Sequence, residues 1–199
     1  GRNLEALTPF RTAATLAPTD AKAAQNVATT LADSGQLQEA MRWFARALAL
    51  NPQLNSAHLL RGYALLGQGR LAEGWAEYGH RMEPVRLSEQ YPELALARTL
   101  PADVRGRHIC VMREQGLGDE IFFLRFAPQL HAAGARITYC ASNKIGSLLV
   151  RVPSLAQVID EASAPPADAD AIMSAGDLPH ALSDFPASLL RDVDATEAR

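Results

Sequence analysis

Small and aromatic residues recur along the first eighty residues at a spacing of 34. Pro18 and Pro52 lie 34 residues apart, and the same residue types precede each proline at the same distances. An alanine stands twelve residues before each proline, a phenylalanine eight before and a second alanine five before: Ala6, Phe10 and Ala13, then Ala40, Phe44 and Ala47. Four matches at one offset indicate an internal repeat rather than a chance similarity.

Each copy of the repeat predicts a pair of helices. In the copy at 21–54 we expect helices over about 21–33 and 37–50. The segment D-S-G-Q between them has the glycine and the polar side chains that favour a helix end and a turn. The second helix ends in L-A-L-N-P-Q, because Pro52 cannot continue it.

The pattern continues into a third copy from residue 55. Gly62 stands at its eighth position, Gly74 replaces the first alanine and Tyr78 replaces the phenylalanine. The third proline is missing, since Arg86 stands at its position. The repeat therefore becomes less regular towards residue 88.

This pattern resembles the tetratricopeptide repeat (TPR), whose period is about 34 residues with small residues where two helices touch. The resemblance implies a TPR array over 1–88, with a half repeat at 1–20 and full repeats at 21–54 and 55–88. About three repeats are normally needed for stability, because one repeat cannot bury its apolar face alone. We therefore expect either further repeats upstream or packing of the array against the segment that follows it.

The inner helices of the array have two possible roles. One is a concave surface that binds a protein or peptide, and the other is a solvated face of a spacer. The spacer is favoured, because the residues facing inwards are few and mixed in character, and extended concave surfaces come from longer arrays. The inward-facing residues are Lys22 and Ser56, together with the four candidate peptide contacts Gln25, Thr29, Leu59 and Tyr63.

The periodic pattern breaks between 83 and 105, which contains three prolines. We expect a connector over 89–105, with at most a short helix at about 93–98.

From 106 onwards, short apolar runs alternate with helical segments. R-H-I-C-V-M, A-R-I-T-Y-C-A, Q-V-I-D-E and D-A-D-A-I-M-S predict strands.

Three helical segments separate or follow these strands. They are E-I-F-F-L-R-F-A-P-Q-L-H-A-A-G, which contains Pro128, N-K-I-G-S-L-L-V-R-V-P, which starts near Ser142, and D-L-P-H-A-L-S-D-F. Alternation of strands and helices is typical of a parallel sheet. The predicted fold class is thus α + α/β, with helical repeats followed by an incomplete Rossmann-like domain over 106–199.

The loop E-Q-G-L-G-D-E at 114–120 follows the first strand, where open α/β sheets bind ligands. A dinucleotide loop would have a third glycine at Ile121, and a mononucleotide P-loop would have lysine at Asp119. A helix N-terminus attracts anions, but Glu114, Asp119 and Glu120 would repel a phosphate. Asp119 can act as a general base on a hydroxyl or simply cap the helix, and the residues alone favour the cap.

The segment from E-Q-G-L-G-D to G-A-R-I resembles the first βα unit of heptosyltransferase-like GT-B glycosyltransferases. It is closer to their TPR-fused relatives, and the match covers about 106–180. The resemblance implies that Asp119 is the catalytic base that deprotonates an acceptor sugar. It also implies a set of substrate-binding residues, in which the glycines let the backbone turn and approach a ligand: Glu114, Gln115, Gly116, Gly118 and Arg125.

These enzymes have a second Rossmann-like domain that binds most of the nucleotide-sugar, whereas this sequence stops at Arg199 after about four strands. We therefore expect the acceptor-side half of a glycosyltransferase that transfers a sugar to a hydroxyl. This half would be inactive alone, so enzyme activity depends on a donor domain in a longer protein. The alternative is a non-catalytic interaction module in which the α/β part caps the repeats.

Composition and charge narrow the classes of function and partner that remain. The 199 residues carry a net charge of −3, with a pI of about 6.0, which does not indicate nucleic acid as a partner. No apolar run reaches the length of a membrane span, and no signal peptide is evident at Gly1, so we expect a cut or processed cytoplasmic protein. Cys110 and Cys140 are expected to be buried, reduced thiols, and no metal or cofactor is expected.

Overall fold

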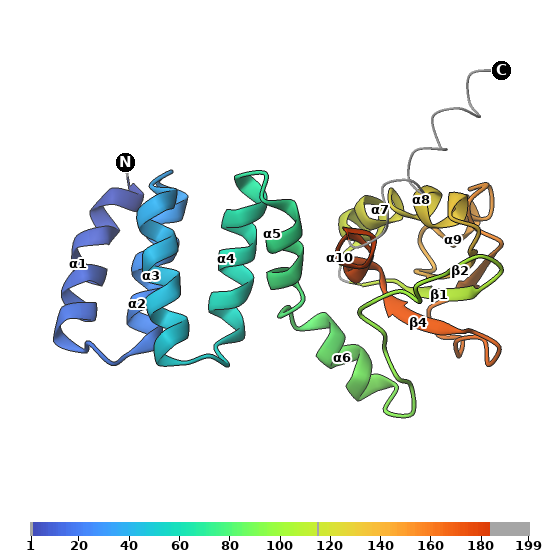
Figure 1. Cartoon of the computed structure of the whole chain (residues 1–199), viewed down its shortest axis with the longest axis horizontal. Helices are drawn as coiled ribbons and strands as arrows, with labels where there is room; N and C mark the ends of the chain where they lie inside the picture. Colours follow the sequence, from blue (N-terminus) through green and yellow to red (C-terminus); the bar gives the residue numbers. More distant parts are fainter. Residues whose placement is uncertain (1, 115, 184–199) are drawn as a thin grey trace, which may run out of the picture. The chain divides into compact units, whose positions relative to one another are not determined.

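The structure is a computed structural model that describes residues 2–114 and 116–183, with side chains from residue 5. The chain divides into two compact units, 1–81 and 82–199 (Figure 1). Each unit is described by itself. The division falls inside the segment 55–88, which the sequence pattern predicts as the last repeat.

The first unit consists of antiparallel helix pairs. Its helices are α1 Arg2–Leu16, α2 Ala21–Asp33, α3 Leu37–Leu50, α4 Asn55–Gly67 and α5 Leu71–Tyr78. The bounds of α2 and α3 match the predicted pair. Asp20 caps α2 by accepting hydrogen bonds from the amides of Lys22 at 2.8 Å and Ala23 at 3.3 Å.

In the second copy of the repeat, the small and aromatic positions belong to the core of this unit, whereas Ala13 of the first copy is exposed. Ala40, Phe44 and Ala47 have no exposed surface. Gly35 and Gly69, with φ of 77° and 74°, connect the helices within each pair. A positive φ is a conformation that glycine adopts without strain, so the two glycines allow the tight helix–helix turns.

The second unit is a parallel sheet. Its strands are β1 His108–Met112, β2 Arg136–Ala141, β3 Gln157–Asp160 and β4 Ala171–Ser174, in the order β3-β2-β1-β4. All three pairings are parallel. Together with the helical repeats, this sheet confirms the predicted fold class of helical repeats followed by α/β.

Helices cover both faces of the sheet. Figure 1 shows α7 Leu117–Leu124, α8 Ala127–Ala132 and α9 Gly146–Leu149 on one side and α6 Glu83–Gln90 on the other. On the α6 side, Leu87 packs in one cluster with residues that alternate along β1 and β2, namely Cys110, Met112 and Cys140. The 3-10 turn Ala175–Asp177 and α10 Leu178–Ser183 follow β4.

The structure corrects the predicted helix at about 93–98. The helix lies at Glu83–Gln90 instead, and Leu96 forms an isolated parallel bridge with Ile172 of β4. Pro84 fits the first turn of a helix, where no intrahelical bond from its nitrogen is needed. Pro92 disfavours a helical conformation at Tyr91, so the helix ends before it.

Two other predicted helices differ from the observed ones. The single helix containing Pro128 is two helices, because α7 ends at Leu124 and Pro128 occupies the first turn of α8. The helix expected to start near Ser142 is only the short α9, Gly146–Leu149. No helix within the described ranges combines the length and the apolar character needed to cross a membrane.

Candidate functional site

The strand order places a topological switch point between β1 and β4. The chain runs from β1 outwards to β2 and β3, then returns to the other side of β1 with β4. Ligands of open α/β sheets bind beyond the carboxyl ends of the strands at such a point. The loop that leaves β1 contains the E-Q-G-L-G-D segment, so Glu114 and Asp119 lie at this end of the sheet.

Glu114 joins the two strands at the switch point. Its side chain is 1% exposed, and Oε1 accepts hydrogen bonds from Ser174 Oγ at 2.7 Å and from the amide of Gly176. A buried carboxylate that accepts two bonds from the protein is satisfied within the fold. Glu114 therefore holds the end of β1 against the turn after β4.

Glu120 is the second buried carboxylate of the loop. It has no exposed surface, its Oε1 accepts a hydrogen bond from the amide of Ser142 at 2.9 Å, and its Oε2 lies 3.6 Å from Arg113 Nε. Burial, reinforced by the negative charge of Glu120, raises the pKa of Tyr139. The side chain of Glu120 thus anchors α7 to the end of β2, and its charge is directed into the protein.

Asp119 lies in the first turn of α7 and is partly exposed. Its Oδ2 accepts a hydrogen bond from the amide of Gly116 at 3.3 Å, a long bond of the helix-capping kind. Of the three acidic residues of the loop, Asp119 alone keeps a solvent-accessible carboxylate. The capping role and a role as base are compatible, because the second oxygen of the carboxylate is not used in this bond.

The structure corrects one part of the role expected for the two loop glycines, namely that the turn needs their conformational freedom. Gly116 has an extended conformation, with φ of −90° and ψ of 170°, and neither Gly116 nor Gly118 has a positive φ. A Cβ on Gly116 would meet only Asp119 Oδ2, at 3.6 Å, and a Cβ on Gly118 would meet nothing within 4 Å. The turn does not require glycine, and what the two residues provide is open space above the loop.

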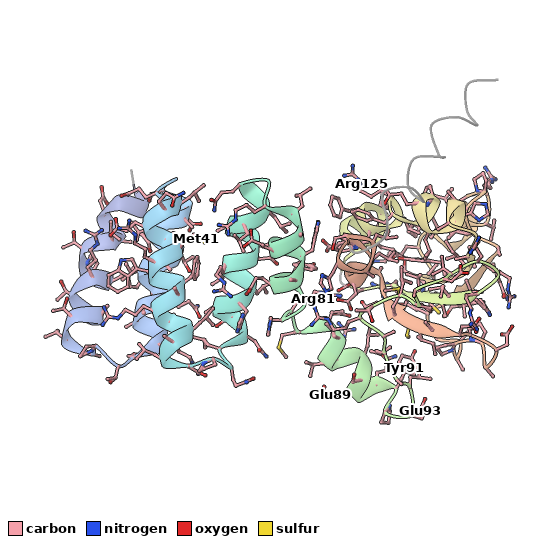
Figure 2. The ribbon with its side chains drawn as sticks, viewed as in Figure 1. Met41, Arg81, Glu89, Tyr91, Glu93 and Arg125 are labelled. Carbon is pink, nitrogen blue, oxygen red and sulfur yellow. The ribbon has the colours of Figure 1, made fainter. Side chains whose placement is uncertain are left out.

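Arg125 lies at the other end of α7, six residues after Asp119, which corresponds to about 9 Å along the helix axis. Its side chain projects from the α/β unit (Figure 2), with the guanidinium 5.4 Å from the ring centre of Phe122 and 5.9 Å from that of Phe126. The structure therefore separates Arg125 from the Asp119 end of the helix. Gln115, the remaining predicted contact, lies outside the described residues.

A pocket of about 260 Å³ between α6 and the carboxyl ends of the strands was not predicted. Arg113, directly after β1, forms an ion pair with Glu161, directly after β3, and Tyr91 donates a hydrogen bond to the Glu161 carbonyl at 3.1 Å. Met112 and Cys140 also line the pocket. In the sequence, the charged residues that immediately follow two of the strand runs could have indicated this pocket.

Of the four predicted peptide contacts of the repeats, two line a pocket and two do not. Gln25 Oε1 accepts a hydrogen bond from Ser56 Oγ at 2.7 Å, which links α2 to α4. Thr29 and Tyr63 line a pocket of about 360 Å³, and Tyr63 is half exposed. Leu59 is half-buried and is not among the residues that line this pocket.

Metal binding by oxygen and nitrogen ligands finds no support in the described part of the chain. Residues 2–114 and 116–183 contain no group of three or more His, Cys, Asp or Glu residues that could hold a metal ion. Two of the histidines, His58 and His80, stack with ring centres 3.8 Å apart.

Comparisons with known proteins give limited similarity. No model of a known protein family matches the sequence. Protein FlbA of Caulobacter vibrioides is 31% identical over 118 residues, which are 58% of this chain and 20% of that protein. A solved structure of a mutant O-GlcNAc transferase of Thermobaculum terrenum matches 80% of this chain and 32% of its own, with 19% identity and a TM-score of 0.36. The chain thus spans about a fifth of its curated relative, and a TM-score of this size supports no further conclusion.

Proposed function

We propose that this chain forms the acceptor side of a TPR-containing glycosyltransferase of the heptosyltransferase-like GT-B type. The observation that carries the proposal is the position of Asp119. It lies at the carboxyl end of β1, beside the β1–β4 switch point, and it is the accessible carboxylate of the E-Q-G-L-G-D loop. This position supports a role for Asp119 as a general base.

In the proposed reaction, Asp119 accepts the proton of an acceptor hydroxyl as the hydroxyl oxygen bonds to the anomeric carbon of a nucleotide-sugar. The bond from that carbon to the nucleotide breaks, and the nucleoside diphosphate leaves with the electron pair. A base contributes in this way when it lies within hydrogen-bond reach of the proton that it removes. The space above Gly118, where a Cβ would meet nothing within 4 Å, supports the approach of an acceptor.

Glu114 and Glu120 act as positioning residues in this proposal. Glu114 holds the start of the loop to β4, and Glu120 holds α7 to the end of β2. Precise placement of a catalytic group requires such supporting contacts. In this proposal, the nucleotide-sugar donor binds to a further domain. The chain spans about a fifth of the length of Protein FlbA, so the activity of a whole protein of that kind is itself proposed.

The experiment that tests this function uses the natural full-length protein. It is incubated with a panel of nucleotide-sugars and simple hydroxyl acceptors, and the release of nucleoside diphosphate is followed together with the mass of the products. We expect acceptor-dependent release for at least one donor. If no donor of a broad panel is hydrolysed or transferred, the proposal is wrong.

A second function, peptide binding by the repeats, is supported by the pocket that contains Thr29 and Tyr63. Apolar groups of Phe44, Leu60 and Ala64 line the same pocket, and an aromatic side chain at the rim of an apolar pocket is a frequent binding contact. If the repeats bind a protein, Tyr63→Ala should lose that partner in a pull-down. Leu71→Ala, which removes an exposed apolar side chain on α5, should retain it.

The two functions respond to different substitutions. A pull-down that loses its partner with Tyr63→Ala but not with Asp119→Ala would favour the interaction module. Loss of sugar transfer with Asp119→Ala, and not with Tyr63→Ala, would favour the enzyme.

A further inference from the structure

Three residues with sulfur-containing side chains, Cys110, Met112 and Cys140, pack in one cluster on the α6 side of the sheet. Cys110 Sγ and Cys140 Sγ lie 3.6 Å apart, and both thiols are buried. Met112 is the direct neighbour of Cys140 in the β1–β2 register and belongs to the same packed cluster. All three residues lie on one face, because Cys110 and Met112 are two residues apart on β1.

We propose that Cys110, Met112 and Cys140 form a binding site for a soft monovalent metal ion of the Cu(I) or Ag(I) kind. Thiolate and thioether ligands are the ones that select such ions. A metal–sulfur bond of about 2.3 Å places the sulfurs of a three-coordinate site about 4.0 Å apart. The two thiols therefore need to separate by only a few tenths of an ångström.

A disulfide is the competing use of two close thiols, and the register argues against it. Cys110 is paired with Thr138, so Cys140 lies one strand across and two residues further along. With about 4.8 Å between strands and about 3.3 Å per residue, the two Cα atoms are about 8 Å apart. Disulfides rarely form when this distance exceeds about 7 Å, whereas an ion between the sulfurs spans it.

The surroundings favour an ion of low charge. Leu87, Leu94, Ile159 and Ile172 pack around the sulfurs, and apolar surroundings penalise a net charge. Either sulfur can be the donor in the contact between Cys110 and Cys140, and Cys140 is the one that lines the pocket beside α6. Binding of a monovalent ion to the Cys140 thiolate, with release of its proton to water, leaves a neutral group that Cys110 and Met112 complete as neutral ligands.

The pocket beside α6 provides an entry path. Met112 and Cys140 line this cavity of about 260 Å³, and Arg86 and Gln90 of α6 line it from the other side. Arg86 is largely exposed. An ion can therefore reach the sulfurs without opening the sheet.

The test is a competition titration of the whole chain with Cu(I) against a chromophoric Cu(I) chelator in the absence of oxygen, with native mass spectrometry for the stoichiometry. We expect one ion per chain, and a fall in affinity of at least about 10- to 100-fold for Cys140→Ala, since even changes around a metal site cost this much. Met112→Leu, which conserves volume, should also weaken binding. Met173→Leu changes a buried thioether of β4, on the opposite face, and should not.

A second measurement needs no substitution, so it remains valid if the variants fold poorly. Bound Ag(I) should protect Cys140 of the unaltered chain from alkylation by N-ethylmaleimide, and Zn²⁺ at the same concentration should not. The proposal is overturned if the double variant Cys110→Ala/Cys140→Ala binds Cu(I) as tightly as the unaltered chain. Equal protection by Zn²⁺ would also overturn it.

Discussion

The side chains of Glu114 and Ser174 connect the carboxyl ends of β1 and β4 through a 2.7 Å hydrogen bond inside the protein. The two residues are 60 positions apart in the chain, so the bond joins the loop of the candidate site to the last strand of the sheet. This contact explains why an acidic loop is stable beside a buried strand end. The carboxyl group of Glu114, one of the acidic groups of this loop, joins β1 to the end of β4 at the switch point.

Glu114→Ala should destabilise the α/β unit by about 2–4 kcal/mol, because the substitution leaves the Ser174 hydroxyl and the Gly176 amide without their buried acceptor. Urea unfolding followed by far-UV circular dichroism measures the change. The matched control, Glu89→Gln, alters an exposed carboxylate of α6 and should change stability by less than about 0.5 kcal/mol. Equal stability of the Glu114 and Glu89 variants would show that the contact is not formed.

The contacts of Glu77 predict that the free energy of unfolding of the repeat unit depends on pH. Burial alone would raise the pKa of Glu77, but hydrogen bonds from Arg61 and His58 outweigh it and hold the pKa below its usual value. A lowered pKa in the folded state adds stability above the ordinary glutamate value of about 4.3, and this stability is lost as the pH falls through the lowered value. Glu77→Gln should therefore cost about 1–3 kcal/mol at pH 7, and the difference should shrink towards pH 3.

The control for this prediction lies on the same helix. Glu73 pairs with Arg70 in solvent, where screening weakens an ion pair, so Glu73→Gln should change stability little at either pH. Trp43 and Trp75 both lie in residues 1–81, and their fluorescence follows the unfolding of this unit. A Glu77→Gln effect of the same size at pH 7 and pH 3 would contradict the assigned role.

Gly74→Ala should destabilise the repeat unit, whereas Gly67→Ala should not. A Cβ on Gly74 would lie 2.7 Å from Leu66 Cγ and 3.0 Å from its backbone nitrogen, because α4 and α5 touch there. We expect Gly74→Ala to cost about 1–3 kcal/mol, which exceeds the helix preference of alanine of at most about 1 kcal/mol. A Cβ on Gly67 would meet nothing within 4 Å, so Gly67→Ala should be neutral or slightly stabilising in the same urea titration. If both variants are stabilised, the helices do not pack as described.

The helices of the repeats could be predicted because their information is local. Ala40, Phe44 and Ala47 repeat the residue types of the first copy at one offset from a proline, and in the second copy all three are buried between helices. The α6 helix could not be predicted in this way. Its position depends on Leu87, which is buried against Cys110 and Met112 of a strand more than twenty residues later.

The candidate site shows the same limit. The sequence places Glu114, Asp119 and Glu120 near one strand end, but it does not show which of them are buried. Burial is decided by Ser174 and by the Ser142 amide, which the sheet topology brings to the loop from 60 and 22 residues away. The distinction between positioning carboxylates and an accessible one therefore emerges only from the tertiary structure.

The proposed role of Asp119 as the base of a sugar transfer is tested most directly by Asp119→Asn in the full-length protein. Asparagine keeps an oxygen that can accept the Gly116 amide bond, so the substitution separates helix capping from proton transfer. With the best donor and acceptor, kcat/KM should fall by about 10²- to 10⁴-fold, while the urea midpoint stays unchanged and the Glu89→Gln control keeps full activity. Sugar transfer by Asp119→Asn at the unaltered rate would show that Asp119 is not the base.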